Sequence, residues 1–201
     1  KNQPIFYEDC TISVAEVAST FFENILFDYV FPTLSEKEKT TALFGKIQDD
    51  MGTIFRQIAF YNYEKEMHAL VREKGGLSKD EFAVLYSKHL KMYLGSAFKL
   101  TEDDGYGYVY IPHFRDFFYV YSYAYGQLIS KAMYEKYKKD PMFIEKVKKF
   151  LSAGGSMSPE DIFKSIGIDT SKPEFFEGGL RSIDSDIKLL EKLAKEAGMI
   201  K

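Results

Sequence analysis

Helical spacing of apolar residues dominates residues 13–31, which read SVAEVASTFFENILFDYVF. The apolar positions recur every three or four residues: Val14, Val17, Ala18, Phe21, Ile25 and Tyr29. This period predicts one amphipathic helix from about Ser13 to Phe31, which ends before Pro32. One carboxylate, Glu16, lies among the small and apolar residues of this helix, where an unpaired charge is costly.

The same pattern continues along the chain, with recognisable start and stop signals between helices. It predicts helices over residues 35–47, 51–74, 78–94 and 113–138, and shorter ones that begin near 140, 158 and 173. Ser35 with Glu38 and Ser78 with Glu81 have the spacing of capping boxes. Gly154-Gly155-Ser156 lacks the lysine of a phosphate-binding loop and is interpreted as a turn between helices. The sequence therefore predicts an all-α fold.

Residues 96–112 interrupt this helical pattern. They combine glycines and a proline with the alternating tyrosines Tyr106, Tyr108 and Tyr110. We expect one long loop or a short strand here, and ordered loops of this length are more often functional than idle. His113 follows directly.

Composition narrows the class of protein. The chain has 27 basic and 30 acidic residues without a block of like charge, so nucleic acid is not an expected partner. No uncharged stretch is long enough for a membrane span, and none is expected. The single cysteine, Cys10, excludes an internal disulfide framework and favours a reducing compartment, so we expect a cytoplasmic protein. Its acidic neighbours Glu8 and Asp9 disfavour a nucleophilic thiolate.

Several side chains are candidates for chemistry, each beside a structural alternative. Glu16 is a candidate metal ligand, or forms an ion pair with Arg56. His113 is a candidate donor to a substrate carbonyl, or a structural hydrogen-bonding residue. The tyrosines of residues 119–125 are candidate oxyanion donors, or core residues.

Other metal and catalytic motifs are weaker or absent. Glu64 and His68 have i, i+4 spacing and could share a metal, although surface pairing is the interpretation we favour. The Glu-x-x-His spacing of di-iron bundles, a Gly-rich phosphate loop and a Gly-x-Ser-x-Gly elbow are all missing from the sequence.

Five ordered stretches together resemble a known family. They are residues 14–21 (VAEVASTF), 55–57 (FRQ) with Phe60 and Glu64, 111–114 (IPHF), 118–126 (FYVYSYAYG) and 150–159 (FLSAGGSMSP). In this order they resemble the oligoendopeptidase F branch of the thimet-oligopeptidase-like zinc metallopeptidases. The likeness extends over nearly the whole chain. It departs from the family pattern at Phe22 and at residues 115–117.

The resemblance implies an activity and roles for individual residues. In such enzymes a His-Glu-x-x-His helix supplies two zinc ligands and the general base, and a glutamate on the next helix supplies the third ligand. Glu16 matches that glutamate. His113 and Tyr121 are then expected to bind the substrate carbonyl and the tetrahedral oxyanion, with Tyr119 and Tyr123 as further candidates.

The resemblance also implies where the chain belongs in such an enzyme. Residues 1–201 would be a multi-helix C-terminal portion of a zincin-type oligopeptidase catalytic domain, with the His-Glu-x-x-His segment expected just upstream of Lys1. The expected substrates are short peptides, the expected cofactor is zinc, and we expect the chain alone to be inactive, because a catalytic zinc needs three protein ligands. The alternative is a metal-free helical peptide- or protein-binding module, a pseudo-enzyme. The sequence leaves the oligomeric state open.

Overall fold

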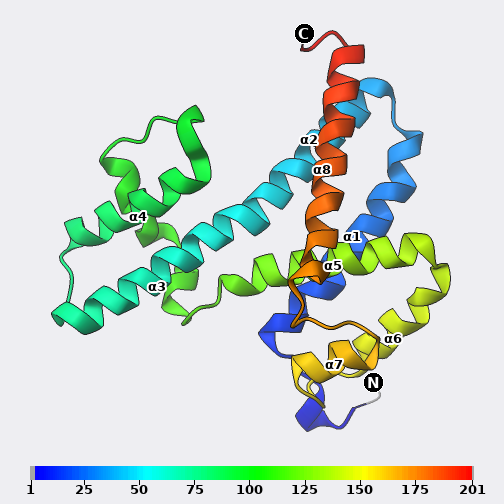
Figure 1. Ribbon diagram of the computed structural model, residues 1–201, viewed down its shortest axis with the longest axis horizontal. Coiled ribbons are helices and arrows are strands. Elements are labelled where there is room, and N and C mark those ends of the chain that lie inside the picture. The colour runs from blue at the N-terminus through cyan, green and yellow to red at the C-terminus, as the bar shows by residue number, and fades with distance from the viewer. Residues whose placement is uncertain (1–2, 201) are drawn as a thin grey trace. The chain divides into compact units, whose positions relative to one another are not determined.

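The computed structural model describes residues 3–200, except for the side chain of Ser13. All regular elements of this part are helical (Figure 1), without a strand, which confirms the predicted all-α class. The chain forms two compact units, one made of the residues up to 50 with those from 125 onward, and one of residues 51–124. No helix of the described residues is long and apolar enough to cross a membrane.

Most of the α-helices belong to the first unit. They are α1 (Ile12–Val30), α2 (Glu36–Asp50), α5 (Tyr121–Lys139), α6 (Ile144–Ser152), α7 (Pro159–Ser165) and α8 (Pro173–Glu196), where the first turn of α5 lies in the second unit. The helices of the second unit are a π-helical segment (Met51–Arg56), α3 (Gln57–Lys74), α4 (Lys79–Leu94) and three 3-10 segments (Gly95–Ala97, Asp103–Tyr110 and Pro112–Arg115).

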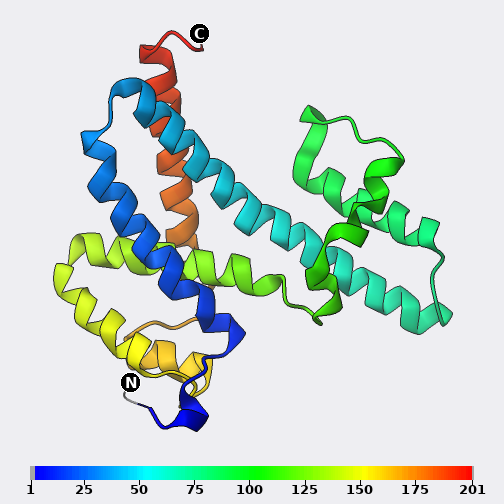
Figure 2. The same ribbon diagram turned by 180° about the vertical axis from the view of Figure 1, so that it is seen from behind.

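The core of the first unit lies where α1 crosses α5, as both views show (Figure 2). Phe21 of α1 is fully buried, and its ring centre lies 6.1 Å from that of Tyr134 and 6.0 Å from that of Tyr137. Phe163 of α7 stacks on Phe150 of α6 with ring centres 5.3 Å apart. Buried residues of α1, α5, α6 and α7 belong to one cluster, so these helices share one core. Burial of each such side chain contributes roughly 1.5–3 kcal/mol.

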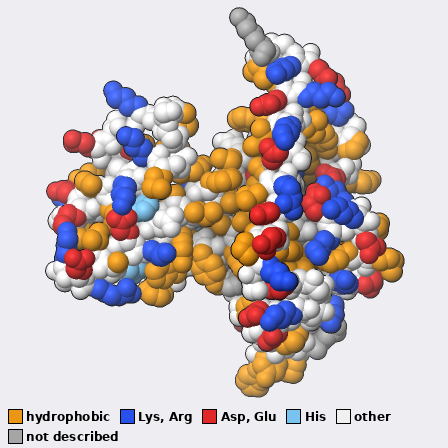
Figure 3. All heavy atoms as spheres, in the orientation of Figure 1, with side chains coloured by type: hydrophobic (Ala, Val, Ile, Leu, Met, Phe, Trp, Pro, Cys, Tyr) orange, Lys and Arg blue, Asp and Glu red, His pale blue; other side chains and the backbone are white. Residues whose placement is uncertain are grey.

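Helix α8 packs against α2 and carries charged residues along its outer side. Figure 3 shows Lys and Arg side chains alternating with Asp and Glu along this helix. Arg181 pairs with Glu177, and Lys188 with Asp184, at i, i+4 spacing. Exposed pairs of this kind contribute little stability, so α8 is held mainly by its apolar face.

The glycine pair after α6 lies against the N-terminal segment. Gly154 has a φ of +52°, and the Gly155 N–H donates to the Tyr7 carbonyl at 2.8 Å. A Cβ on Gly154 would collide with that carbonyl, and one on Gly155 with the carbonyl of Asp9. The predicted turn is thus confirmed, and its glycines are needed for close backbone contact.

The second unit is built on aromatic packing between α3 and α4. Phe60, Tyr63, Tyr86 and Val120 are buried together, and Phe114 packs against them. The Ser78 capping box is present, since Ser78 Oγ accepts from Glu81 N at 3.2 Å and the Glu81 carboxylate accepts from Ser78 N at 2.8 Å.

Two predicted helix boundaries are wrong. The predicted break between residues 47 and 51 is absent, because α2 continues to Asp50 and the π-helical segment leads directly into α3. The predicted helix from 113 to 138 begins only at Tyr121, after the 3-10 segment Pro112–Arg115 and a non-helical turn. Its physical cause is Phe118, whose φ of +55° is incompatible with an α-helix. Residues 96–112 form the long connection that the sequence predicts, with 3-10 turns and without a strand.

Candidate active site

His113 lies in an aromatic cluster of the second unit. Its Nε2 is 2.9 Å from the Tyr123 hydroxyl, and its ring centre is 5.0 Å from that of Tyr119. The Tyr119 and Tyr123 rings are 5.5 Å apart. Three of the residues singled out in the sequence therefore meet, and the His113 ring is hydrogen-bonded to a tyrosine hydroxyl.

Tyr121 takes a different position from these three residues. It is the first residue of α5, its side chain is 37% exposed, and its ring packs edge-on to Tyr61 at 6.4 Å. Val120, the residue before it, is fully buried. Tyr121 therefore packs against Tyr61 of α3, and part of it is exposed at the surface.

The turn that carries these side chains is anchored by Glu64 of α3. The Phe118 N–H donates to Glu64 Oε1 at 2.7 Å, and Glu64 is completely buried. His68 Nε2 lies 3.8 Å from the same oxygen, and its ring contacts that of Phe118 at 5.3 Å. The predicted pairing of Glu64 with His68 is present, but it is not a surface pair, because the Glu64 side chain is completely buried.

Burial raises the pKa of Glu64, while the hydrogen bond from Phe118 and the proximity of His68 lower it. The second oxygen, Oε2, is buried without a hydrogen-bond partner among the described residues. A buried carboxylate of this kind is costly unless it has a structural or chemical use. In the sequence, Glu64 was marked by its i, i+4 spacing to His68 and by its place in one of the five stretches that carry the family resemblance.

Glu16 lies in the first unit, on the side of α1 that meets α5. Gly126 of α5 is so close that a Cβ there would be 2.9 Å from the Glu16 Cβ. Thr20 Oγ1 donates to the Glu16 carbonyl at 2.7 Å. Among the described residues of this unit, the half-buried Glu16 carboxylate has no ion pair or hydrogen bond. The alternative partner, Arg56, belongs to the other unit, and that pairing stays a prediction.

A buried ion pair that the sequence did not reveal joins α2 and α5. Lys131 Nζ is 2.7 Å from Asp50 Oδ2, and both side chains are at most 2% exposed. Gln127 donates to Asp50 Oδ1 at 2.6 Å. Burial lowers the pKa of Lys131, against the charge of Asp50, which raises it.

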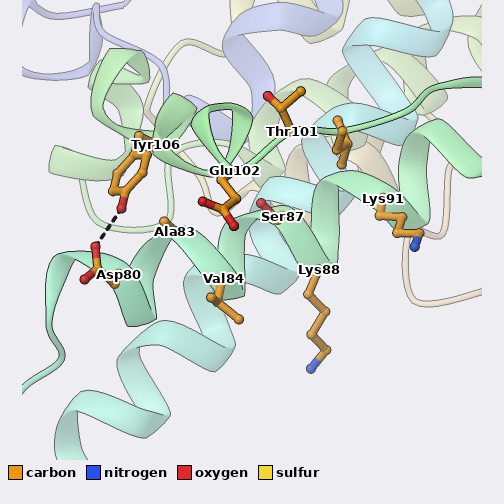
Figure 4. A pocket seen from close by; sticks show the side chains of 10 residues that line it. Asp80, Ala83, Val84, Ser87, Lys88, Lys91, Thr101, Glu102 and Tyr106 are labelled. Carbon is orange, nitrogen blue, oxygen red and sulfur yellow. Dashed lines mark hydrogen bonds between the residues drawn. The ribbon is translucent and has the colours of Figure 1, made fainter.

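A cavity in the described part of the second unit is lined by none of the candidate residues Glu16, His113, Tyr119 and Tyr121. This cavity, of about 640 Å³, lies between α4 and residues 100–106, where the Tyr106 hydroxyl donates to Asp80 at 2.6 Å (Figure 4). It is lined by Ala83, Val84, Ser87, Lys88, Lys91, Leu100, Thr101 and Glu102 besides these two. Among residues 3–200, no group of three His, Cys, Asp or Glu side chains is arranged to hold a metal ion.

The sequence of this helical chain matches the pattern of a peptidase family. Residues 1–182 match Peptidase family M3, and the chain belongs to that family. It is similar to "Oligopeptidase PepF" of Bacillus subtilis, with 31% identity over 195 residues that cover 96% of this chain and 29% of the relative. It is also 29% identical over 195 residues to "Oligoendopeptidase F homolog" of Borreliella burgdorferi, 33% of which is covered.

Solved structures show the same likeness. A crystal structure of oligoendopeptidase-F from Enterococcus faecium matches with a TM-score of 0.83 and 28% identity, over 92% of this chain and 36% of that one. A putative peptidase from Chlamydophila abortus matches with a TM-score of 0.85 and 28% identity, over 96% of this chain and 33% of that one. The chain therefore spans about a third of the length of the proteins that it matches.

Proposed function

We propose that the chain is the C-terminal portion of the catalytic domain of a zinc oligoendopeptidase that cleaves short peptides in the cytoplasm. The observation that carries this proposal is the match to Peptidase family M3 over residues 1–182. The names of the similar proteins, oligopeptidase and oligoendopeptidase F, support short peptides as substrates.

In this proposal Glu16 is one zinc ligand. A half-buried carboxylate without a partner in its own unit fits that role, since carboxylate oxygens bind zinc and α1 is held closely against α5 beneath it. The other two ligands and the general base would come from a His-Glu-x-x-His helix outside the present chain. Zinc bound there supplies a Lewis acid and lowers the pKa of bound water.

The second unit supplies the proposed substrate-binding donors. His113 and Tyr121 would donate hydrogen bonds to the peptide carbonyl oxygen as it becomes negatively charged, and Tyr119 is the further candidate for this role. Such donors accelerate acyl transfer when they are fixed in place before the reaction. The ring contacts of Tyr119 with His113 and the Tyr123–His113 hydrogen bond support a fixed imidazole.

The first experiment compares the natural full-length protein that contains this chain with its Glu16→Gln variant. Zinc content and hydrolysis of a fluorogenic peptide are measured on both. We expect the wild type to bind one zinc and cleave the peptide. The variant should lose at least about 10-fold in zinc affinity or activity, because the amide carries no negative charge.

Glu23→Gln is the matched control, because Glu23 lies on the same helix and is exposed. It should keep both zinc and activity. Full zinc binding and full activity in Glu16→Gln would remove Glu16 from the metal site. A full-length wild type that neither binds zinc nor cleaves peptides would overturn the peptidase and favour the metal-free binding module.

A further inference from the structure

Phe118 has a backbone conformation that its side chain disfavours. Its φ of +55° places it in the left-handed region, and it is the one non-glycine residue among the described residues with positive φ. For a bulky residue this conformation is unfavourable, so the surrounding structure must compensate for it. Such strain in native proteins is concentrated at functional sites.

The compensation comes from α3. Glu64 Oε1 accepts the Phe118 N–H at 2.7 Å, and hydrogen bonds to a charged acceptor are about twice as strong as neutral ones. The Phe118 ring lies against His68 at 5.3 Å and against Tyr61 at 5.7 Å. Both the backbone and the ring of the strained residue are therefore held by one face of α3.

The strained residue also separates the candidate donors along the chain. His113 lies before Phe118, whereas Tyr119 and Tyr121 follow it. The turn is closed by the Tyr119 N–H, which donates to the Asp116 carbonyl at 2.8 Å, and by the Ser122 N–H, which donates to the Tyr119 carbonyl at 3.1 Å. A change of φ at Phe118 would therefore redirect both tyrosines relative to His113.

We propose that Glu64 is a positioning residue of the peptidase site, which fixes the strained turn at Phe118 and thereby sets His113, Tyr119 and Tyr121 in register. This inference rests on the proposed function for its catalytic part. Its geometric part concerns only residues of the second unit and can be tested without activity.

Two substitutions at Glu64 distinguish the loss of the hydrogen-bond acceptor from the loss of the negative charge. Glu64→Leu fills the buried space and removes the acceptor, whereas Glu64→Gln keeps an amide oxygen that can still accept from Phe118. The matched control is Glu66→Gln, two residues along α3, whose carboxylate contacts His89 and Lys88 instead. A graded effect, with Leu greater than Gln and Glu66→Gln without effect, is the expected pattern.

The geometric test uses NMR on the 201-residue chain. We expect the Phe118 amide of Glu64→Leu to exchange at least about 10-fold faster than in the wild type, and the His113 ring resonances to shift. The denaturation midpoint of Glu64→Leu should fall, because the Phe118 N–H loses its acceptor, and that of Glu64→Gln, which keeps an acceptor, should fall less. An unchanged Phe118 amide and unchanged His113 resonances would overturn the proposal.

The catalytic test uses the natural full-length protein. Glu64→Leu should lower kcat by about 10- to 100-fold with little change in KM, and Glu64→Gln should recover part of the loss. A mere loss of stability would not produce this split. If the wild type is inactive but the NMR changes occur, the proposed function fails while the positioning of the turn stands. An active Glu64→Leu enzyme with the wild-type kcat would refute the positioning role.

Discussion

Gly126 places the Glu16 carboxylate by lacking a side chain of its own. The glycine lets α5 approach α1 until a Cβ would be 2.9 Å from the Glu16 Cβ and 3.6 Å from the Val17 nitrogen. No rotation of a side chain relieves a contact at Cβ. The position of Glu16 is therefore set by the close approach of the α5 backbone to α1.

The Gly126→Ala variant of the 201-residue chain tests this contact. We expect it to lower the free energy of unfolding by about 1–3 kcal/mol, because α1 must move away from α5 to admit the methyl group. Urea unfolding followed by circular dichroism measures the change.

Gly45→Ala is the control for that substitution. Gly45 is also helical, in α2, and a Cβ there meets nothing within 4 Å. Its replacement should be neutral or stabilising by up to about 1 kcal/mol, because alanine is the better helix former. Equal stability of the two variants would show that the Gly126 contact is not tight.

At the scale of one element, the N-terminus of α4 predicts a specific pH dependence. The Ser78 backbone, then the Lys74 and Ser78 side chains, lower the pKa of Glu81 from 4.5 to about 2. A carboxyl group with a depressed folded-state pKa stabilises the protein above its unfolded value, and this contribution is lost as the pH falls towards the folded one. Glu81 should therefore stabilise the fold above about pH 4.5 and lose this effect between about pH 4.5 and 2.

The measurement is the melting temperature of the wild type and Glu81→Gln as a function of pH. The wild type should melt higher at pH 7, and the difference should shrink as the pH falls from 4.5 towards 2. Glu73→Gln, at an exposed position of α3, should show no such trend. A difference that is constant with pH would contradict the capping role of the charge.

Helix boundaries were predictable from the sequence where a residue at the boundary itself decides it. Gly75, with a φ of +80°, ends α3, and Ser78 starts α4, as their residue types indicate. Phe118 could not be predicted, because a phenylalanine in a left-handed conformation depends on Glu64, which is 54 residues away in sequence. The start of α5 was missed for the same reason.

The candidate site was predictable to a similar extent. The meeting of His113 with Tyr119 and Tyr123 follows the pattern that the sequence singles out, since these residues are close along the chain. The burial of Glu64 and the contact of Gly126 with Glu16 depend on packing between separate helices. Neither periodicity nor motif spacing contains that information.

For the whole molecule, the two units have separate hydrophobic cores. Phe163 belongs to the core of the first unit and Leu85 to that of the second, and the two clusters have no residue in common. We expect Phe163→Ala, which costs roughly 3–5 kcal/mol, to increase hydrogen exchange mainly in residues up to 50 and from 125 onward. Amide exchange resolved by residue on the 201-residue chain checks this.

The reciprocal variant is Leu85→Ala, which should loosen residues 51–124 and leave α6 and α7 protected. Equal loss of protection in both units, from either substitution, would show that the chain unfolds as one cooperative body. The expected result would instead give each unit its own stability.

The buried Asp50–Lys131 pair has a consequence for the evolution of this protein. Loss of either partner would leave an uncompensated charge inside the first unit, and such losses typically cost 3–5 kcal/mol, roughly, whereas an apolar pair of similar volume is tolerated. A lineage that changed only one of these two positions would have produced a poorly folded protein. Lineages that abandon the pair should therefore have exchanged both residues together, so that positions 50 and 131 covary among homologues.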